Sequence, residues 1–388
     1  MTPFDMGRVP PITFGPGRLT EAPAILAGLG GGPTLLVADR VLADLGVVDT
    51  LAAGLGTADI AVELAAEIGG EPKEGLVDQL ADRARESGCK TVIGLGGGAA
   101  MDCAKLVAGI AGAAAPAGTY ALSAKPMPGA RLPALAIPTT AGTGSEVTRT
   151  SIVSNADGHK LWYWDEGLMF AHALLDPELT LSLPQTITAW TGIDAVAHAL
   201  EAVTAKTTNA AGLLYGHQAL RVLANALPAA VAHGDDIDAR SQMLWASTVA
   251  GLALHNCNTH LGHNISHALG SLAPVHHGLA TGLALEIALP WLGERTDNPL
   301  LARASAALGG AERADALGET FAKLMRDAAI PAERPTVADA VTKEALAEQM
   351  KSAANRSMAD NALTDVSDQD TDELAGRLLA LPLAQRAA

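Results

Sequence analysis

Hydrophobic and polar positions along the first 180 residues follow two patterns in turn. Short apolar runs predict buried strands over 34–40, 91–98 and 131–140, and apolar residues at helical spacing predict helices over 73–87 and 99–112. Strands that alternate with helices in this way are typical of a parallel sheet covered by helices on both faces. We therefore expect an α/β domain in this part of the chain.

The pattern changes near residue 182. Ser182 stands ahead of Pro184 as a predicted helix N-cap, and the residues that follow show a 3.6-residue apolar period. Alanine- and leucine-rich helical stretches then continue nearly to the end of the chain, without strand-like alternation. The prediction is an α/β domain over residues 1–180 followed by an all-helical domain over residues 181–388.

Composition and charge narrow the possible function classes. The 388 residues are 49% hydrophobic and 18% charged, which is typical of a globular protein with a large core. Lys and Arg number 26 against 42 Asp and Glu, a net charge of −16, so nucleic-acid binding is not expected. Apolar runs stop short of the roughly 18–20 residues that a membrane helix needs. Three widely separated cysteines and no secretory signal predict a cytoplasmic protein.

A glycine-rich segment follows the second predicted strand. Gly96, Gly97 and Gly98 precede a helix, where backbone amides and the helix dipole can bind a diphosphate; the alternative is a plain tight turn. The usual dinucleotide fingerprint has its acidic residue about 20 positions downstream. Here the candidate for binding the ribose, Asp39, lies upstream, at the end of another strand. The alternative for Asp39 is a solvated carboxylate at a strand end.

Histidines are concentrated in one segment of the second half. Six of the eleven fall between residues 255 and 277, namely His255, His260, His263, His267, His276 and His277. His263 and His267 have the i,i+4 spacing of one helix face, and Asp194 and His198 repeat it on an earlier helix. A carboxylate and several imidazoles suit iron, zinc or a similar divalent metal. The alternative is a polar or pH-sensitive seam between helices.

Several segments carry a resemblance to a known family. They are GGGAAMDCAK (96–105), IPTTAGTGSEVT (137–148), LLDPELTLSLP (174–184), GIDAVAHALEA (192–202), GHNISHALG (262–270) and HHG (276–278). In this order they resemble the iron-containing, or group III, alcohol dehydrogenases, relatives of glycerol dehydrogenase and dehydroquinate synthase. The resemblance implies a dehydroquinate synthase-like architecture, in which an α/β dinucleotide-binding domain precedes an all-α domain.

The resemblance also implies a cofactor site. Asp39 matches the aspartate that contacts the adenosine ribose in the family, where a carboxylate repels a 2′-phosphate and favours NAD over NADP. The other matching positions are Gly96, Gly97, Gly98 and Asp102 for the pyrophosphate, Thr139, Thr140 and Thr148 for the phosphates and nicotinamide ribose, and Lys160 as a further cofactor contact.

A metal site follows from the same resemblance. The family's ligands match Asp194, His198, His263 and His277, which implies Fe²⁺, with Zn²⁺ as the alternative. His267 matches a histidine near the substrate that is not a ligand, and is the candidate for relaying a proton during catalysis. The other histidines of the segment match no ligand position and are interpreted as structural or pocket residues.

The sequence also departs from the family pattern, and two of the departures lie near candidate site residues. Glu71 stands before Pro72 where the family usually has an asparagine beside the cofactor. Trp162, Tyr163 and Trp164 form an aromatic run where the family is usually aliphatic, and they are interpreted as a substrate entrance, a subunit contact or packing.

The expected function is hydride transfer between NAD(H) and a small alcohol or aldehyde by a metal-dependent oxidoreductase, in a homo-oligomer of two or more chains. One alternative is a metal-free, NADH-dependent reductase that resembles maleylacetate reductase. A second is a lyase that resembles dehydroquinate synthase, which would need a basic phosphate pocket that the sequence does not show near its histidines. The third is a non-catalytic protein that binds NAD or a metal.

Overall fold

The computed structural model describes residues 3–384 and divides into two compact units. The α/β unit consists of Arg8–Thr140 and Gly144–Ser182. The helical unit consists of the chain from Leu183 onward, together with Ala141–Thr143 and the residues before Arg8.

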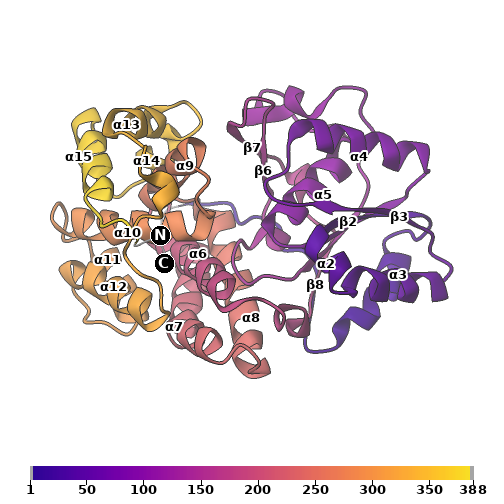
Figure 1. The fold of residues 1–388 in the computed structure, drawn as a ribbon, viewed down its shortest axis with the longest axis horizontal. Helices are drawn as coiled ribbons and strands as arrows, with labels where there is room; N and C mark the ends of the chain where they lie inside the picture. The colour runs from indigo at the N-terminus through magenta and orange to yellow at the C-terminus, as the bar shows by residue number, and fades with distance from the viewer. Residues whose placement is uncertain (1–2, 385–388) are drawn as a thin grey trace. The chain divides into compact units, whose positions relative to one another are not determined.

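A six-stranded parallel sheet forms the centre of the α/β unit (Figure 1). The strand order is β1–β8–β5–β4–β2–β3, with β1 at Ile12–Phe14, β2 at Thr34–Asp39, β3 at Val62–Ile68, β4 at Thr91–Gly96, β5 at Ala134–Pro138 and β8 at His172–Leu175. The central strands β2, β4 and β5 are buried almost throughout, as expected where helices cover both faces of a parallel sheet. The predicted α/β fold class is confirmed, and so are the three predicted strands.

Helices cover the two faces of this sheet, and α4 and α5 lie on the opposite side from α3 (Figure 1). Their bounds are α1 Ala22–Gly28, α2 Arg40–Asp44, α3 Val47–Thr57, α4 Glu74–Glu86 and α5 Gly98–Ile110. On the α1–α3 face, Leu26 and Leu55 pack with Leu36 and Ile93 of the strands in one apolar core. On the other face, a Cβ at Gly94 would lie 2.9 Å from the Ala104 Cβ, so this glycine allows α5 to pack closely on β4.

The aromatic run of the sequence lies on a hairpin that the apolar pattern did not predict. Strand β6 at Thr150–Ser154 pairs antiparallel with β7 at Lys160–Trp164. Tyr163 is fully buried, and its hydroxyl donates a hydrogen bond to Glu74 Oε1 at 2.6 Å. The Arg149 guanidinium lies 3.7 Å from the centre of the Trp164 ring. Within this unit the run therefore packs one aromatic side chain inside and covers another with a cation.

The helical unit contains ten α-helices in the described part of the chain. They are α6 Gln185–Val203, α7 Ala210–Ala232, α8 Ile237–Cys257, α9 Leu261–Leu272, α10 His277–Gly293, α11 Pro299–Ala307, α12 Leu317–Asp327, α13 Lys343–Lys351, α14 Arg356–Asp360 and α15 Asp368–Leu379. The predicted cap at Ser182 is wrong, because α6 begins at Gln185 with Pro184 as its N-cap. The residue before a proline is pushed towards extended backbone, so Leu183 cannot start the helix.

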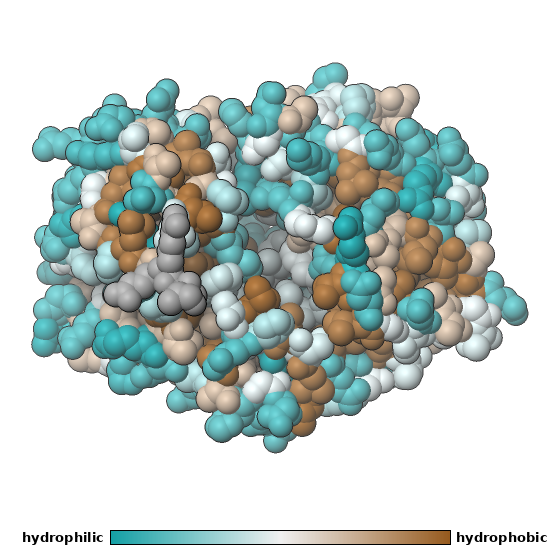
Figure 2. Space-filling view, viewed as in Figure 1, coloured by the Kyte–Doolittle hydropathy of each residue, from teal (hydrophilic) through white to brown (hydrophobic). Residues whose placement is uncertain are grey.

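Hydrophilic residues predominate along the rim of the face shown in Figure 2, and apolar residues form separate patches there. None of the helices described between residues 3 and 384 combines the length and apolarity required to cross a membrane.

Candidate metal and dinucleotide sites

The candidate dinucleotide residues lie at the carboxyl ends of three neighbouring strands. Strand β2 ends at Asp39, β4 ends at Gly96, and β5 ends directly before Thr139. After β2, the chain adds β3 on one side of that strand and β4 on the other, so the strand order reverses between β2 and β4. Ligands of open parallel sheets bind beyond the carboxyl ends of the strands at such a point. The same connectivity explains why the candidate acid precedes the glycine loop in the sequence.

Asp39 contacts the glycine loop directly. Its Oδ2 atom accepts a hydrogen bond from the Gly97 backbone amide at 2.7 Å. Gly96 has a φ of +147°, and a Cβ there would collide with the same carboxylate, so both the backbone and the space require glycine. Burial raises the pKa of Asp39, and the hydrogen bond from Gly97 opposes this rise. Asp39 is thus held at the loop rather than left in solvent.

An open pocket of about 470 Å³ lies beside Asp39; its lining residues are Asp39, Arg40, Val41, Asp44, Ile68, Gly69 and Gly70. Helix α5 begins next to it, at Gly98, with Gly97 as the N-cap. The amides of this first turn lack carbonyl partners within the helix and carry the positive end of its dipole, which suits an anion. Thr140 lies beside Gly97, and the Thr139 amide donates to the Gly96 carbonyl at 2.9 Å.

Thr148 belongs to a buried network around Lys105, a residue that sequence reasoning missed. The Lys105 ammonium donates to Thr148 Oγ1 at 3.1 Å and to the Thr150 carbonyl at 2.7 Å, and it lies 3.9 Å from Asp102 Oδ1. Burial lowers the pKa of Lys105 to about 8, although Asp102 and Glu146 act to raise it. The i,i+3 spacing of Asp102 and Lys105 on a helix was the available signal.

Asp102 accepts hydrogen bonds from several groups of the α/β unit. Its Oδ1 atom accepts from the Ser145 hydroxyl at 2.6 Å and its Oδ2 atom from the Ile152 amide at 2.8 Å. The Ser151 hydroxyl donates to the Asp102 carbonyl at 2.9 Å. These contacts join α5 to β6 and to the loop that precedes it, so Asp102 organises the segment that carries Thr148.

Lys160 and Glu71 form an ion pair. The Lys160 ammonium at the start of β7 lies 2.7 Å from Glu71 Oε2. Glu71 directly follows two glycines that line the pocket beside Asp39. The carboxylate that departs from the family pattern is therefore neutralised by the lysine that matches a cofactor contact.

Three of the four candidate metal ligands, all histidines, converge on a carboxylate oxygen of the fourth, Asp194. Asp194 and His198 lie one turn apart on α6, His263 lies in the first turn of α9, and His277 begins α10. The Nε2 atoms of His198, His263 and His277 lie 3.9, 3.8 and 3.5 Å from Asp194 Oδ1, respectively. Donor atoms of Asp194, His263 and His277 all lie within 4.8 Å of one another, and His198 falls outside this mutually close set.

Two of these donor atoms are buried and unsatisfied. Asp194 Oδ1 and His263 Nε2 have no hydrogen-bond partner within residues 3–384. Buried polar atoms are normally paired, so each such atom calls for an explanation. His198 directs its Nδ1 atom to the Gly142 carbonyl at 3.3 Å, which leaves its Nε2 atom turned towards Asp194. One carboxylate and several imidazole nitrogens that converge in this way fit a divalent iron or zinc ion.

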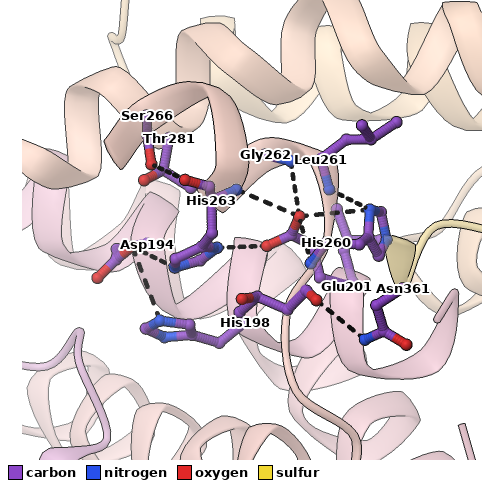
Figure 3. Close-up of polar contacts among 12 residues, drawn as sticks. Asp194, His198, Glu201, His260, Leu261, Gly262, His263, Ser266, Thr281 and Asn361 are labelled. Carbon is purple, nitrogen blue, oxygen red and sulfur yellow. Dashed lines mark hydrogen bonds and ion pairs between the residues drawn. The ribbon is translucent and has the colours of Figure 1, made fainter. Parts of the chain in front are cut away.

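Glu201 is a residue of this site that sequence reasoning missed. It lies fully buried on α6 and contacts His263 Nδ1 (Figure 3). Burial alone would raise the pKa of Glu201, but His263 and His260 lower that pKa to about 2, so the carboxylate is ionised. The available signal was spacing, because Asp194, His198 and Glu201 follow the i, i+4, i+7 pattern of one helix face.

The other histidines surround this centre in different ways. The His267 ring centroid lies 5.3 Å from that of His277 and 5.9 Å from that of His263. The His276 ring lies 5.0 Å from a ring of Trp190. His260 is fully buried and hydrogen-bonded to Thr204, while His255 is buried beside Gly7. His267 thus lies within the cluster without belonging to the close ligand set.

Comparison with known proteins gives the class to which this fold and these residues belong. The sequence model of the family of iron-containing alcohol dehydrogenases matches residues 10–177. The sequence model of the C-terminal region of the Fe-containing alcohol dehydrogenase family matches residues 188–375. The chain therefore belongs to the iron-containing alcohol dehydrogenase family.

Individual relatives agree with this assignment. The chain is 36% identical over 280 residues to the probable alcohol dehydrogenase EutG of Escherichia coli, covering 71% of this chain and 70% of the relative. It is 31% identical over 280 residues to the NAD-dependent methanol dehydrogenase of Bacillus methanolicus, covering 71% and 72%.

Solved structures show the same fold. Sulfoacetaldehyde reductase from Bifidobacterium kashiwanohense, in complex with NAD⁺, superimposes with a TM-score of 0.87 at 27% identity, covering 98% of this chain and 100% of that one. A 1,3-propanediol oxidoreductase superimposes with a TM-score of 0.88 at 29% identity, covering 97% and 100%.

Proposed function

We propose that this protein is a metal-dependent alcohol dehydrogenase that transfers a hydride between NAD(H) and a small alcohol or aldehyde. Its family supports an oxidoreductase that acts on alcohols or aldehydes with NAD. The observation that carries the metal dependence is the convergence of three imidazole Nε2 atoms on Asp194 Oδ1, where two buried donor atoms lack hydrogen-bond partners within the described chain.

Asp194, His198, His263 and His277 are the residues that hold the ion in this proposal. A divalent ion supplies Lewis-acid chemistry, which makes an alcohol hydroxyl more acidic and polarises an aldehyde carbonyl. The single carboxylate reduces the net charge of a bound dication and its ligands by one. Fe²⁺ is the proposed metal and Zn²⁺ the alternative, because both accept mixed imidazole and carboxylate donors.

His267 is the proposed proton carrier. It lies on the helix face of His263 and next to the His277 ring, and it is partly exposed. An imidazole in that position can accept the hydroxyl proton during alcohol oxidation and return it during aldehyde reduction.

The cofactor residues have separate roles. Asp39 binds the ribose hydroxyls of the adenosine and excludes a 2′-phosphate, because a carboxylate repels it. The glycine loop of Gly96, Gly97 and Gly98 binds the pyrophosphate at the N-terminus of α5, with Thr139 and Thr140 at the same edge of the sheet. In the proposal Asp102 belongs to the pyrophosphate-binding segment and Thr148 lies near the phosphates and nicotinamide ribose, with Lys105 keeping both in place, and Lys160 contacts the cofactor from β7.

The proposal includes the organisation and location of the protein. The α/β unit is the NAD-binding domain and the helical unit is the metal-binding domain, divided near residues 180 and 181. A cytoplasmic location is supported by the three cysteines, which are all buried and unpaired. A homo-oligomer of two or more chains is proposed from the family resemblance.

The first experiment measures metal content by elemental analysis of anaerobically purified protein, together with NADH oxidation on a panel of short aldehydes. The expected result is about one iron or zinc ion per chain and activity that a chelator removes. Metal-free protein that reduces an unsaturated keto acid with NADH would instead support the maleylacetate reductase-like alternative. Elimination of phosphate would support the lyase, and bound metal and NAD without any turnover would support a non-catalytic protein.

A further inference from the structure

Glu201 connects the two helices that carry metal ligands. It lies on α6, three residues after His198, and its contacts reach the start of α9 (Figure 3). Its Oε1 atom accepts hydrogen bonds from the backbone amides of His260 at 3.1 Å, Gly262 at 2.7 Å and His263 at 3.3 Å, and its Oε2 atom contacts His263 Nδ1. Both carboxylate oxygens are thereby directed towards the start of α9, and Oε2 meets the His263 nitrogen that does not face Asp194.

The contact with Nδ1 determines which nitrogen of His263 carries the hydrogen. Glu201 accepts three backbone N–H bonds, as a carboxylate does, and a carboxylate only accepts hydrogen bonds, so the hydrogen of the contact with His263 lies on Nδ1. A metal binds the neutral form of an imidazole, which has one N–H group, so in that form Nε2 keeps a free lone pair. That atom is buried, has no hydrogen-bond partner among residues 3–384, and lies 3.8 Å from Asp194 Oδ1. This is the state of an imidazole that can bind a metal.

His260, the neighbouring histidine, shows that the arrangement is specific. Its Nδ1 atom accepts from the Leu261 amide at 2.7 Å, and its Nε2 atom is 2.9 Å from Thr204 Oγ1. Thr204 donates its own hydrogen to the Leu200 carbonyl at 2.6 Å, so His260 must donate to Thr204. Two adjacent buried histidines are therefore held in opposite tautomers, and only His263 has its Nε2 atom available.

We propose that Glu201 is a positioning residue for the metal: it fixes His263 as the Nδ1–H tautomer, orients its ring and anchors the first turn of α9. This rests on the proposed metal site of Asp194, His198, His263 and His277. Carboxylates that accept from the second nitrogen of a ligand histidine orient the ring and raise its basicity, and their loss costs about 10–100-fold in metal affinity or activity.

The test is Glu201→Gln, which keeps the shape of the side chain. The amide oxygen can still accept from the three backbone amides at the start of α9, but the amide nitrogen then faces His263 Nδ1 as a donor. His263 must carry its hydrogen on Nε2 instead, where it blocks the metal. We expect Co²⁺ affinity, measured by competition with a chromogenic chelator, to fall about 10–100-fold, and the visible spectrum of bound Co²⁺ to change.

Two variants separate this role from a purely structural one. Glu201→Asp keeps the charge and the acceptor, and is expected to recover part of the lost affinity. Thr204→Val removes the hydrogen bond to His260 in the same buried corner without altering the contact between Glu201 and His263, and is expected to keep the Co²⁺ affinity and spectrum of the wild type.

Each outcome bears on one claim. If the wild type binds Co²⁺ and Glu201→Gln binds it equally tightly with the same spectrum, the role of Glu201 is overturned and the metal site stands. If the unfolding temperature of metal-free Glu201→Gln falls while its Co²⁺ affinity is unchanged, Glu201 acts only as a cap of α9 and the proposal is again overturned. If the wild type binds no metal, the proposed function itself fails.

Discussion

The carboxylate of Asp39 and the backbone amide of Gly97 are 58 residues apart in sequence and joined by a hydrogen bond of 2.7 Å. The bond connects the end of β2 to the N-cap of α5. It therefore joins the candidate ribose-binding carboxylate to the candidate pyrophosphate-binding loop. The same carboxylate fills the space that a side chain at position 96 would occupy. Asp39 and its loop therefore form one unit, and any change at Asp39 alters both.

Removing the charge of Asp39 is expected to relax the preference against NADP. Asp39→Asn keeps an oxygen that accepts from Gly97 but no longer repels a 2′-phosphate. Asp39→Gly removes the acceptor as well as the repulsive charge. We expect the ratio of kcat/KM for NADP over NAD to rise about tenfold or more in each variant, which corresponds to about 1.4 kcal/mol. An unchanged ratio in both variants would show that Asp39 does not contact the ribose.

Breaking the ion pair of Glu71 and Lys160 is expected to strengthen NAD binding. Glu71→Gln frees the lysine for a cofactor phosphate, so KM for NAD should fall. The pair is partly exposed and worth no more than about 1 kcal/mol, which limits the fall to about fivefold. Lys160→Met should raise KM, and in that background Glu71→Gln should have no further effect. A double variant that still responds to Glu71→Gln would show that the two residues act separately.

His277→Ala is expected to abolish metal retention and turnover and to spare NAD binding. Loss of a direct ligand should lower metal affinity more than loss of a residue that only hydrogen-bonds to a ligand. The fall should therefore exceed the roughly 10–100-fold that is typical of such a second residue. Elemental analysis and NAD titration by fluorescence measure the two effects. His276→Ala is the matched control, since this neighbour contacts Trp190 and is outside the close ligand set. Full metal content in His277→Ala would refute the ligand assignment.

His267→Gln should separate proton transfer from metal binding. We expect metal content to be unchanged and kcat to fall about 10²-fold, the low end of what a positioned acid or base contributes. The pH dependence of kcat should also become flatter than in the wild type, because a glutamine cannot accept or return a proton. Loss of the metal together with activity would instead assign His267 a role as a ligand.

Lys105 predicts a pH dependence of stability. Its pKa is about 8 in the folded protein against 10.5 in a free lysine, so between these values the unfolded state binds more protons. The free energy of unfolding therefore gains a positive slope with pH in that window, of order 3 kcal/mol in total. Lys105→Met lacks this contribution. The stability difference between wild type and variant, from urea unfolding at pH 7 to 10.5, should shift in favour of the wild type, and a constant difference would contradict the prediction.

The sequence predicted three of the buried strands and missed the short buried strand β8 as well as the less buried strands. The runs that became β2, β4 and β5 are continuously apolar because helices cover both sides. Strand β3 is an edge with a mixed burial pattern, and β1 has only three residues, so neither gives a clear period. The β6–β7 hairpin has Asp157–Gly158 in its turn, between two runs of residues with high β propensity. This turn signal was available in the sequence but was not used.

The candidate site divides in the same way. Helical spacing pairs Asp194 with His198, and His263 with His267, but spacing cannot tell which histidine of the second pair meets Asp194. That choice depends on how α6, α9 and α10 pack, and it was the family resemblance that separated His263 and His277 from their neighbours. Glu201 and Lys105 lie within segments that carry the family resemblance, but their roles depend on contacts with distant segments, which spacing alone does not show.

Because the proposed metal ligands lie on three helices, the ion would also affect the stability of the protein and its lifetime in the cell. A metal held by α6, α9 and α10 acts as a cross-link between parts of the chain that separate on unfolding, so it stabilises the folded form by mass action, by about 2.7 kcal/mol at a free concentration of 100 times its dissociation constant. Iron starvation would then lower the amount of the enzyme as well as its turnover, because a chain without the cross-link is exposed to proteolysis for longer.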